Sequence, residues 1–355
     1  MSILLFIIIL SLLVLAHEWG HFYTARRFKM GVEEFGIGFP PRAWSKVKDG
    51  ITYSLNWLPL GGFVKIKGED GQHVTDADSF MNFPAYKRVI VLVAGVVMNF
   101  LVAAILLGVG YMFGLPQDVA GVDPALIKER QIKVLSAVSG YGAYEAGIKG
   151  GDQIVSFDSQ PVHQISELVE MAGSKIDSVV KVGIVRDGES KIFDVKVSQI
   201  AQTGRGGIGV SLFESGIVAY PWYRAIPQGF VSAGVITKDI TVGFGHMIKG
   251  LFTKEEIGGV AGPVGIAVMT GEVATLGWIY LLQFTAMLSL NLAVLNMVPF
   301  PALDGGRVLF VIIEKISRKR VSHSVEGMVH ATGFLILMLL IIVITFKDVM
   351  HLFVK

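Results

Sequence analysis

The sequence contains no cysteine among its 355 residues. This absence excludes a disulfide framework, a thiolate nucleophile and thiolate metal ligands. A metal ion in this protein must therefore be bound by His, Asp, Glu or Asn side chains. Charge is also scarce, because only 17% of the residues are charged, against roughly 25% in an ordinary soluble domain. The net charge of +2 comes without a basic stripe, so we expect no nucleic-acid partner.

Long uncharged runs replace the missing charge. Four stretches without Asp, Glu, Lys or Arg approach or exceed the ~20 apolar residues that cross a bilayer. The first becomes long enough only if its helix continues through His21 and Phe22. It lacks the basic start and the small-residue cleavage site of a signal peptide, so we expect it to be retained. The four stretches are 2–17, 89–117, 273–303 and 327–346.

The first run ends in an ionisable motif, Ala16-His17-Glu18-Trp19-Gly20-His21. On a helix, residues four apart share one face and lie roughly 6 Å apart. The two histidines therefore suit two ligand positions of a tetrahedral zinc ion. Glu18 is placed to act on a water molecule at the metal without being a ligand. Ionisable residues in an apolar segment usually mark function, but snorkelling at the membrane surface is the alternative.

A second polar motif ends the third run, in the sequence NLAVLNMVPFPALDGGR from Asn291 to Arg307. Pro299 and Pro301 predict that the helix breaks just before Asp304. Broken helices at membrane depth are tolerated where they line a cavity, and a lone carboxylate there is costly unless it is paired or bound to a metal. Asp304 is therefore a candidate third metal ligand; the alternative is a cap on the next helix.

Basic residues predict how the runs are oriented. Arg26, Arg27 and Lys29 follow the first run, and Lys87 and Arg88 precede the second. The positive-inside rule places this loop in the cytoplasm and the N-terminus outside. Basic residues from Arg307 onward mark a second cytoplasmic loop, so Asp304 is expected on the same side as His17 and His21. His330, in the fourth run, is expected to be an interfacial residue rather than a ligand.

Residues 34–68 read as strands. A breaker cluster at 36–41 precedes two alternating segments, 51–57 and 62–67. Because an exposed sheet edge is not tolerated in lipid, this β region lies at the interface or lines a cavity. Its edge, with Val64 and Ile66 as candidate contacts, could pair with an extended substrate. It could equally be a structural cap, and the sequence favours neither reading.

The second run contains Gly95 and Asn99. An asparagine inside an apolar helix needs a hydrogen-bond partner. We expect that partner on another helix or in the active-site pocket.

Residues 120–212 change in character, with alternating segments and no spanning run. Strands are expected at 132–135, 153–157, 179–186 and 192–197, and short helices at 143–147 and 165–172. The segment AGIKGGDQIV, from Ala146 to Val155, resembles the AGL-x-x-GD-x-I signature of PDZ domains. Such domains bind a peptide as an added strand. Residues 204–210 are either the amide-rich loop of that site or a turn into a last strand.

The segment 220–270 separates this insert from the third run. Residues 220–252 are amphipathic, which predicts an interfacial helix rather than a fifth span. The Gly-rich stretch from Gly258 to Ile266 is expected to be a flexible connection or a re-entrant turn.

The pair HEWGH and N-x-x-P-x-P-x-L-D-G, in this order, resembles the site-2 protease family of intramembrane metalloproteases, and within it the bacterial RseP type. The resemblance covers nearly the whole chain, including Gly38-Phe39-Pro40-Pro41, the PDZ insert and the GPVGI stretch. One departure is that about 90 residues leave room for one PDZ domain, where well-known RseP proteins have two.

The resemblance implies that Zn²⁺ is bound by His17, His21 and Asp304 and that Glu18 is the general base. Asn296 and Asn291 would steady the substrate strand or the oxyanion. Family members cut membrane-anchored proteins already shortened by another protease, such as an anti-sigma factor or remnant signal peptides. The implied location is the bacterial inner membrane, with the active site near the cytoplasmic side and the PDZ domain outside.

We therefore predict a multi-span α-helical membrane protein with four transmembrane helices, a cytoplasmic-side β region and an inserted α+β PDZ domain. Two alternatives without peptidase activity are a metal or proton transporter and a membrane-tethered PDZ binding protein. Two histidines and one carboxylate also suit iron or manganese. The expected divisions are 1–23 (first span with HExxH), 24–88 (β region), 89–117 (second span), 120–212 (PDZ domain), 220–270 (interfacial helix and connection), 273–303 (third span), 304–326 (cytoplasmic loop) and 327–346 (fourth span).

Overall fold

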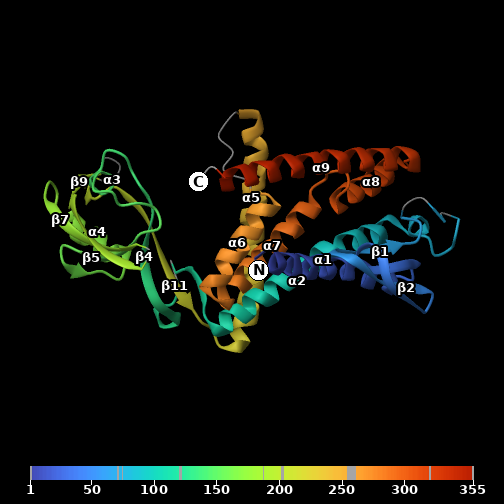
Figure 1. Ribbon diagram of the computed structural model, residues 1–355, viewed down its shortest axis with the longest axis horizontal. Coiled ribbons are helices and arrows are strands. Elements are labelled where there is room, and N and C mark those ends of the chain that lie inside the picture. Colours follow the sequence, from blue (N-terminus) through green and yellow to red (C-terminus); the bar gives the residue numbers. More distant parts are fainter. Residues whose placement is uncertain are drawn as a thin grey trace. The chain divides into compact units, whose positions relative to one another are not determined.

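A computed structural model gives the fold (Figure 1). It divides into two compact units. We call Met1–Gly110 with Ile226–Lys355 the helical unit, and Tyr111–Ala225 the sheet unit. The structure describes residues 2–69, 72–73, 75–119, 122–186, 188–200, 204–253, 261–319 and 321–353.

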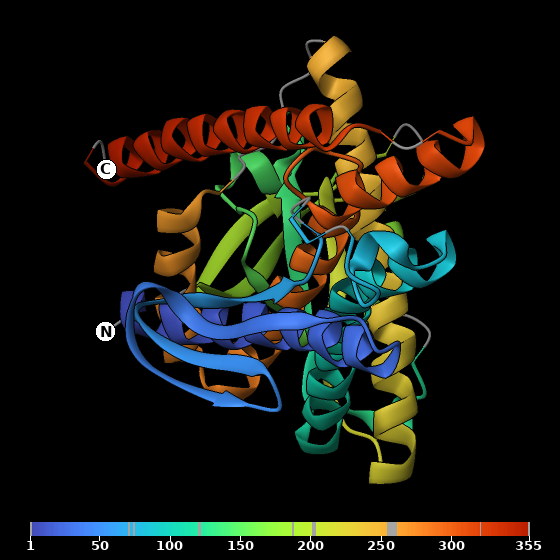
Figure 2. The ribbon, with the colours of Figure 1, turned by 90° about the vertical axis from the view of Figure 1, so that its right-hand side faces the viewer.

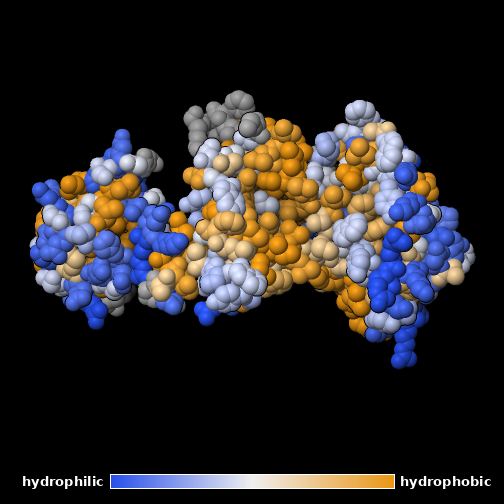
Figure 3. All heavy atoms as spheres, turned by 90° about the horizontal axis from the view of Figure 1, so that it is seen from below, coloured by the Kyte–Doolittle hydropathy of each residue, from blue (hydrophilic) through white to orange (hydrophobic). Residues whose placement is uncertain are grey.

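Long apolar helices build most of the helical unit. Among the described residues, four helices are long and apolar enough to cross a membrane, as the sequence predicted. In the apolar 18-residue window of residues 324–350, only 6% of the residues are buried. Such an exposed apolar surface suits lipid rather than water. Apolar side chains gather over the helical unit on the face shown in Figure 3. The helices are α1 (Ser2–Arg27), α2 (Ala85–Phe113), α5 (Trp222–Thr253), α6 (Pro263–Leu276), α7 (Trp278–Met297), α8 (Asp304–Ser317) and α9 (His323–Phe353).

The β region of the helical unit is a long hairpin beside α1 (Figure 2). Strands β1 (Val32–Lys48) and β2 (Ile51–Ile66) join at Asp49 and Gly50, which both have positive φ. Phe35 pairs with Val64 and also with Tyr53, so the hairpin folds back on itself. Its inner face packs on α1, α2 and α8 in one hydrophobic core that includes Phe22, Phe35, Ile66, Val91 and Val308.

Two predicted spans have different boundaries in the structure. α2 ends at Phe113 rather than 117, because Gly114 adopts a φ of 102° and the next residues form strand β3 (Leu115–Asp118). The stretch 273–303 is not one helix. Gly277, with a φ of 122°, separates α6 from α7, and α7 stops at Met297, two residues before Pro299.

Two predicted connections are partly helical. Residues 304–317 of the expected loop form α8, whose first turn carries Asp304, a favourable charge at a helix N-terminus. Pro263 of the GPVGI stretch opens α6 instead of a turn, in the position where proline suits a helix. Residues 258–260, the first part of the Gly-rich stretch that ends at Ile266, lie outside the described residues. Asp187, which follows the expected strand 179–186, and Arg320, in the expected cytoplasmic loop, also lie outside them.

A seven-stranded sheet forms the core of the sheet unit. Its order is β3-β11-β4-β5-β7-β8, with β6 paired to β5. One face is filled by buried apolar side chains, among them Ile132, Phe157 and Val182, and the helix α4 packs there through Leu168. The remaining elements are β4 (Ile127–Ala137), α3 (Gly142–Glu145), β5 (Gln153–Phe157), β6 (Gln160–Pro161), α4 (Ile165–Gly173), β7 (Val179–Arg186), β8 (Glu189–Lys196), β9 (Ser198–Gln199), β10 (Gly206–Gly207), β11 (Val210–Val218), and the short 3₁₀ turns Phe80–Asn82 and Pro124–Leu126.

Candidate metal centre

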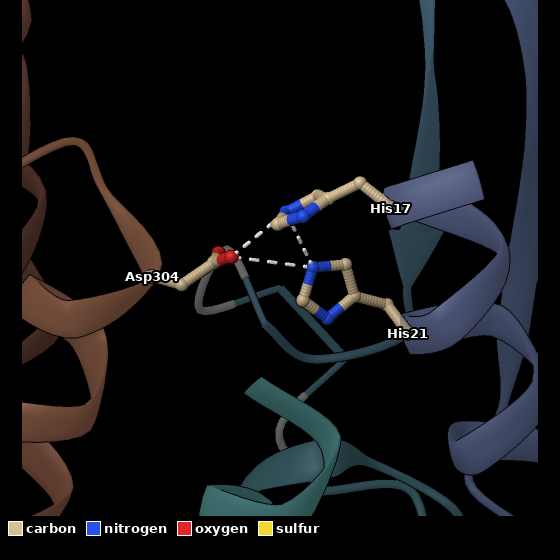
Figure 4. A group of neighbouring side chains, drawn as sticks. All are labelled: His17, His21 and Asp304. Atoms are coloured by element: carbon tan, nitrogen blue, oxygen red, sulfur yellow. Dashed lines mark hydrogen bonds and ion pairs between the residues drawn. The ribbon is translucent and has the colours of Figure 1, made fainter. Parts of the chain in front are cut away.

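The two histidines of the first motif face the same point in the interior (Figure 4). His17 and His21 are each 6% exposed, and their Nε2 atoms lie 3.1 Å apart. The four-residue spacing on α1 brings the rings together, as expected from helix geometry. Two imidazoles held this closely out of water need a common partner.

Asp304 is that partner, although 287 residues separate it from His17. Its Oδ2 lies 2.9 Å from Nε2 of His17 and 3.3 Å from Nε2 of His21. Burial alone would raise the pKa of Asp304, but its bonds to the two histidines outweigh burial and hold the pKa below its usual range. The carboxylate is the form of this side chain that binds a metal ion.

A tight turn presents Asp304. After α7 the chain turns back through residues 298–303 and packs against the first turn of α8. A side chain at Gly305 would overlap the carbonyl oxygens of Met297 and Val298, and one at Gly306 would overlap that of Phe300. This explains the two glycines that follow Asp304. Within the turn, Ala302 has a φ of 77°, which is uncommon for a residue with a Cβ.

The three donor atoms fit a metal ion. One ligand atom from each of His17, His21 and Asp304 lies within 4.8 Å of the others, and the described residues contain no other such group of His, Cys, Asp or Glu. A tetrahedral Zn²⁺ with bonds of about 2.0–2.1 Å separates its donors by roughly 3.3 Å. The observed separations of 2.9–3.3 Å are close to this value. Two imidazoles and one carboxylate also form a typical donor set for a catalytic zinc site.

One face of α2 supports the histidines from behind. Nδ1 of His21 lies 2.8 Å from the carbonyl oxygen of Val91, and Nδ1 of His17 lies 3.4 Å from the amide of Asn99. Between them, a Cβ on Gly95 would overlap both imidazole rings. The sequence indicated that Asn99 needs a partner. Val91 acts through its backbone, which leaves no signal in the sequence.

Glu18 lies next to the cluster but outside it. Its Oε2 accepts a hydrogen bond from the N–H of Val64 (3.1 Å). Ser11 joins α1 to the same part of the hairpin, donating to the carbonyl of Pro59 (2.7 Å) and accepting from the N–H of Gly61 (3.1 Å). The helix that carries the motif is thus fastened along β2.

The other residues singled out in the sequence lie apart from the three converging donors. Asn291 and Asn296 are half-buried on α7, and the Asn291 amide donates to the carbonyl of Met287 one turn earlier in the same helix (2.9 Å). The side chain of Ile66 is only 2% exposed and belongs to the hydrophobic core. Its side chain is therefore not available to a substrate strand.

Three further contacts, not foreseen from the sequence, position the centre. Arg88 on α2 and Glu314 on α8 form a buried ion pair of 2.8 Å, and Arg307 pairs with Glu69. His330, expected at the interface, accepts at Nδ1 a hydrogen bond of 2.9 Å from the N–H of Ala302. These contacts hold α8 and the turn before it against the rest of the helical unit.

A His-x-x-x-His helix, a distant aspartate and an adjacent glutamate, set among spanning helices, define a membrane metalloprotease. Peptidase family M50 matches residues 5–340, and the chain belongs to this family, which confirms the resemblance to site-2 proteases. A Fusobacterium nucleatum protein is 34% identical over 99% of this chain and 100% of its own length. The zinc metalloprotease RasP of Geobacillus kaustophilus is 30% identical over 99% of this chain and 98% of its own length.

Another relative is the regulator of sigma-W protease RasP of Bacillus subtilis, 28% identical over 99% of both chains. Among solved structures, the PDZ domain of an SdrC-like protein from Listeria innocua covers 23% of this chain and 92% of that chain, with 27% identity and a TM-score of 0.22. Family and relatives together identify the protein as a membrane zinc metalloendopeptidase whose cofactor is Zn²⁺.

Proposed function

We propose that His17, His21 and Asp304 hold the zinc ion and that Glu18 is the general base for hydrolysis of membrane-embedded peptide bonds. The observation that carries the proposal is the convergence of the three donor atoms, from α1 and from α8, within 4.8 Å. Glu18 follows His17 directly on the same helix. This combination supports peptide hydrolysis over passive metal transport, because transport needs no base beside the ion.

Each residue of the centre has a distinct task. When bound, Zn²⁺ polarises the substrate carbonyl and makes a water molecule acidic at neutral pH. Glu18 takes a proton from the attacking water and delivers it to the leaving amine. Asn296 and Asn291 are the candidate contacts to the substrate strand or the oxyanion.

The edge of β2 beside α1 is the proposed place for the substrate strand. A helical substrate must unwind before attack, since its amides are hydrogen-bonded internally. The N–H of Val64 points at Glu18, so a strand added along Val64 and the Ile66 backbone would lie next to the base. Addition of a strand to a free edge uses main-chain hydrogen bonds and therefore tolerates varied side chains.

Residues 120–212 are proposed to be a PDZ domain that binds a peptide segment. A groove of about 590 Å³ runs between Leu168, Val169 and Ala172 of α4 and the segment Arg205–Leu212. Strand β3 pairs with β11 only at 215–218. Among the described residues no strand covers that edge of β11 at 210–213. This open edge beside an apolar groove suits an added peptide strand, which favours the loop reading of 204–210.

The proposed substrates are single-span membrane proteins, with an anti-sigma factor or remnant signal peptides as the leading candidates. The Bacillus subtilis relative is named a regulator of sigma-W protease, which supports this choice. The basic residues around 26–29 and 87–88 support a bacterial inner-membrane location with the metal centre near the cytoplasm and the PDZ domain outside.

The test compares Glu18→Gln, Asp304→Ala and Glu272→Gln in the full chain, purified in detergent. Glu18→Gln should keep zinc, measured by elemental analysis, but lose roughly 10²–10⁴-fold in cleavage of a transmembrane reporter. Asp304→Ala should lose both zinc and cleavage. Glu272→Gln makes the same change at an exposed position of α6 and should behave like the wild type. Cleavage retained by Glu18→Gln would contradict the proposed base.

A further inference from the structure

The two histidines of the metal centre rest on chemically different groups of α2. His21 faces the carbonyl oxygen of Val91 at 2.8 Å, whereas His17 faces the side-chain amide of Asn99 at 3.4 Å. Val91, Gly95 and Asn99 are spaced by four residues and so lie on one face of the helix. The difference between a carbonyl and an amide decides where each imidazole carries its hydrogen.

The tautomer of His21 is fixed. A carbonyl oxygen can only accept a hydrogen bond, so Nδ1 of His21 must carry the hydrogen and donate it to Val91. Its Nε2 is then left with the lone pair that a metal requires. Metal-binding histidines usually donate their other ring N–H to such an acceptor.

The tautomer of His17 depends on which end of the Asn99 amide faces it. In the structure the NH₂ group faces Nδ1 of His17. A donor there places the imidazole hydrogen on Nε2, the atom that points at Asp304. The amide oxygen, Oδ1, is buried and has no hydrogen-bond partner in the part of the chain that the structure describes. Asn99 itself is 0% exposed, so bulk solvent does not reach it.

Rotation of the amide by 180° gives Oδ1 a partner and moves the NH₂ group to the position that Oδ1 leaves. The oxygen and nitrogen ends of an amide have nearly the same shape, so the rotation needs no other movement. Oδ1 then faces Nδ1 of His17 and accepts its hydrogen, and Nε2 is freed for a metal. The backbone that carries the amide is held in place, because Ser289 of α7 donates to the carbonyl of Asn99 (2.8 Å).

We infer that Asn99 is a positioning residue that presents Oδ1 to Nδ1–H of His17 and so fixes the tautomer whose Nε2 binds zinc. The inference rests on the proposed zinc-binding role of His17. A purely structural asparagine would instead bond, through its side chain, a group other than a proposed zinc ligand. Here Ser289 bonds the backbone of Asn99, and His17 is the neighbour of the side chain.

Zinc affinity of the full chain in detergent, measured by competition with a chelator, tests the inference. Asn99→Leu keeps the size but removes the acceptor, and should lower zinc affinity by roughly 10–100-fold, the usual cost of losing such a partner. Asn99→Asp keeps an acceptor oxygen and should bind zinc like the wild type. Thr285→Ala removes a hydrogen bond that α7 makes to its own Leu281 carbonyl (2.7 Å) and should also match the wild type. Wild-type affinity in Asn99→Leu, or an equal loss in Asn99→Asp, would overturn the inference.

A spectroscopic measurement on the unaltered chain does not depend on how the variants fold. The ¹⁵N shifts of histidine side chains, assigned with a His17→Gln sample, report which nitrogen carries the hydrogen. In the zinc-free protein we expect it on Nδ1 of His17. A hydrogen on Nε2 in zinc-free protein that still takes up zinc would defeat the role of Asn99 alone. A wild-type chain that binds no zinc would defeat the proposed metal site as well.

Discussion

The helical unit buries many more polar and charged side chains than the sheet unit does. Among the described residues, Asp152 is the single buried polar or charged side chain of the sheet unit, whereas ten lie in the helical unit. The helical unit is only about twice as long, so length does not explain the difference. Its exterior, in turn, exposes many large apolar residues, such as Leu335 and Leu339 of α9.

The solvent around each unit explains the contrast. In water an apolar core supplies the main driving force for folding, and polar groups stay outside. In lipid an apolar exterior costs nothing, and every internal polar group needs a partner. In the helical unit, buried His17, His21 and Asn99 contact one another or Asp304 at the metal centre. The packing that gives His17, His21 and Asp304 their polar partners therefore also brings together the three donor atoms of the candidate metal centre.

The largest expected effect comes from changing the space at the metal centre. Gly95→Ala would place a methyl group against both imidazoles, where the donors converge. We expect zinc affinity to fall by at least ~10–100-fold, comparable to the loss of a supporting group, and cleavage to fall with it. Gly234→Ala, on α5 with open space around it, is the control. The zinc affinity of both variants is measured by competition with a chelator. Unchanged affinity in Gly95→Ala would contradict the close packing of Gly95 against the two imidazole rings.

A second change should damage only the sheet unit. Phe157 is fully buried in its apolar core, and truncation of such a residue costs about 3–5 kcal/mol. Phe157→Ala should therefore lower the stability of the sheet unit in chemical denaturation, followed by hydrogen exchange of its strands. Zinc content should stay at the wild-type level. Loss of zinc in this variant would show that the two units are not independent.

The smallest effect concerns the one buried charge of the sheet unit. Arg186 donates to both carboxylate oxygens of Asp152 (2.6 and 2.7 Å), and these bonds, outweighing burial, lower the pKa of Asp152. A folded pKa below the unfolded one stabilises the fold above the ordinary value near 3.9, and this stability is lost as pH falls through the folded pKa. Protection against hydrogen exchange, relative to the intrinsic rate at each pH, should therefore fall below about pH 4 in β5, which follows Asp152, and in β7, which ends at Arg186.

Asp152→Asn provides the control for this pH dependence. The variant should lose roughly 1–3 kcal/mol at neutral pH, the value of a hydrogen bond to a charged group. It should also show a flatter response to acid. An acid response equal to that of the wild type would assign the pH dependence to another group.

Local patterns predicted much of this structure. His17, Glu18 and His21 were visible because helix spacing alone places them, and Asp304 because a carboxylate follows two helix-breaking prolines in an apolar run. The four apolar spans and the hairpin followed from hydropathy and alternation. The expected third span was wrong as one helix, because the positive φ of Gly277 separates α6 from α7. A single backbone angle of this kind leaves little signal in hydropathy.

Tertiary contacts could not be predicted in the same way. Asn99 was recognised as needing a partner, but nothing in the sequence names His17 as that partner. The Val91 carbonyl is a backbone group that any residue would supply. His330 was predicted to be interfacial. Its bond to Ala302 could not be foreseen, because it depends on how α9 packs against a turn 28 residues earlier in the chain.

The separation of His17 and Asp304 along the chain has a consequence for biogenesis. With the proposed ligands, neither the first helix nor the last third of the protein contains a complete set of donors, so no partial product of synthesis would hold the ion tightly. The binding energy of zinc is then available only to the assembled helical unit, which it stabilises at a late step of folding. Proteolytic activity is therefore expected only after α1 and the first turn of α8 have packed together.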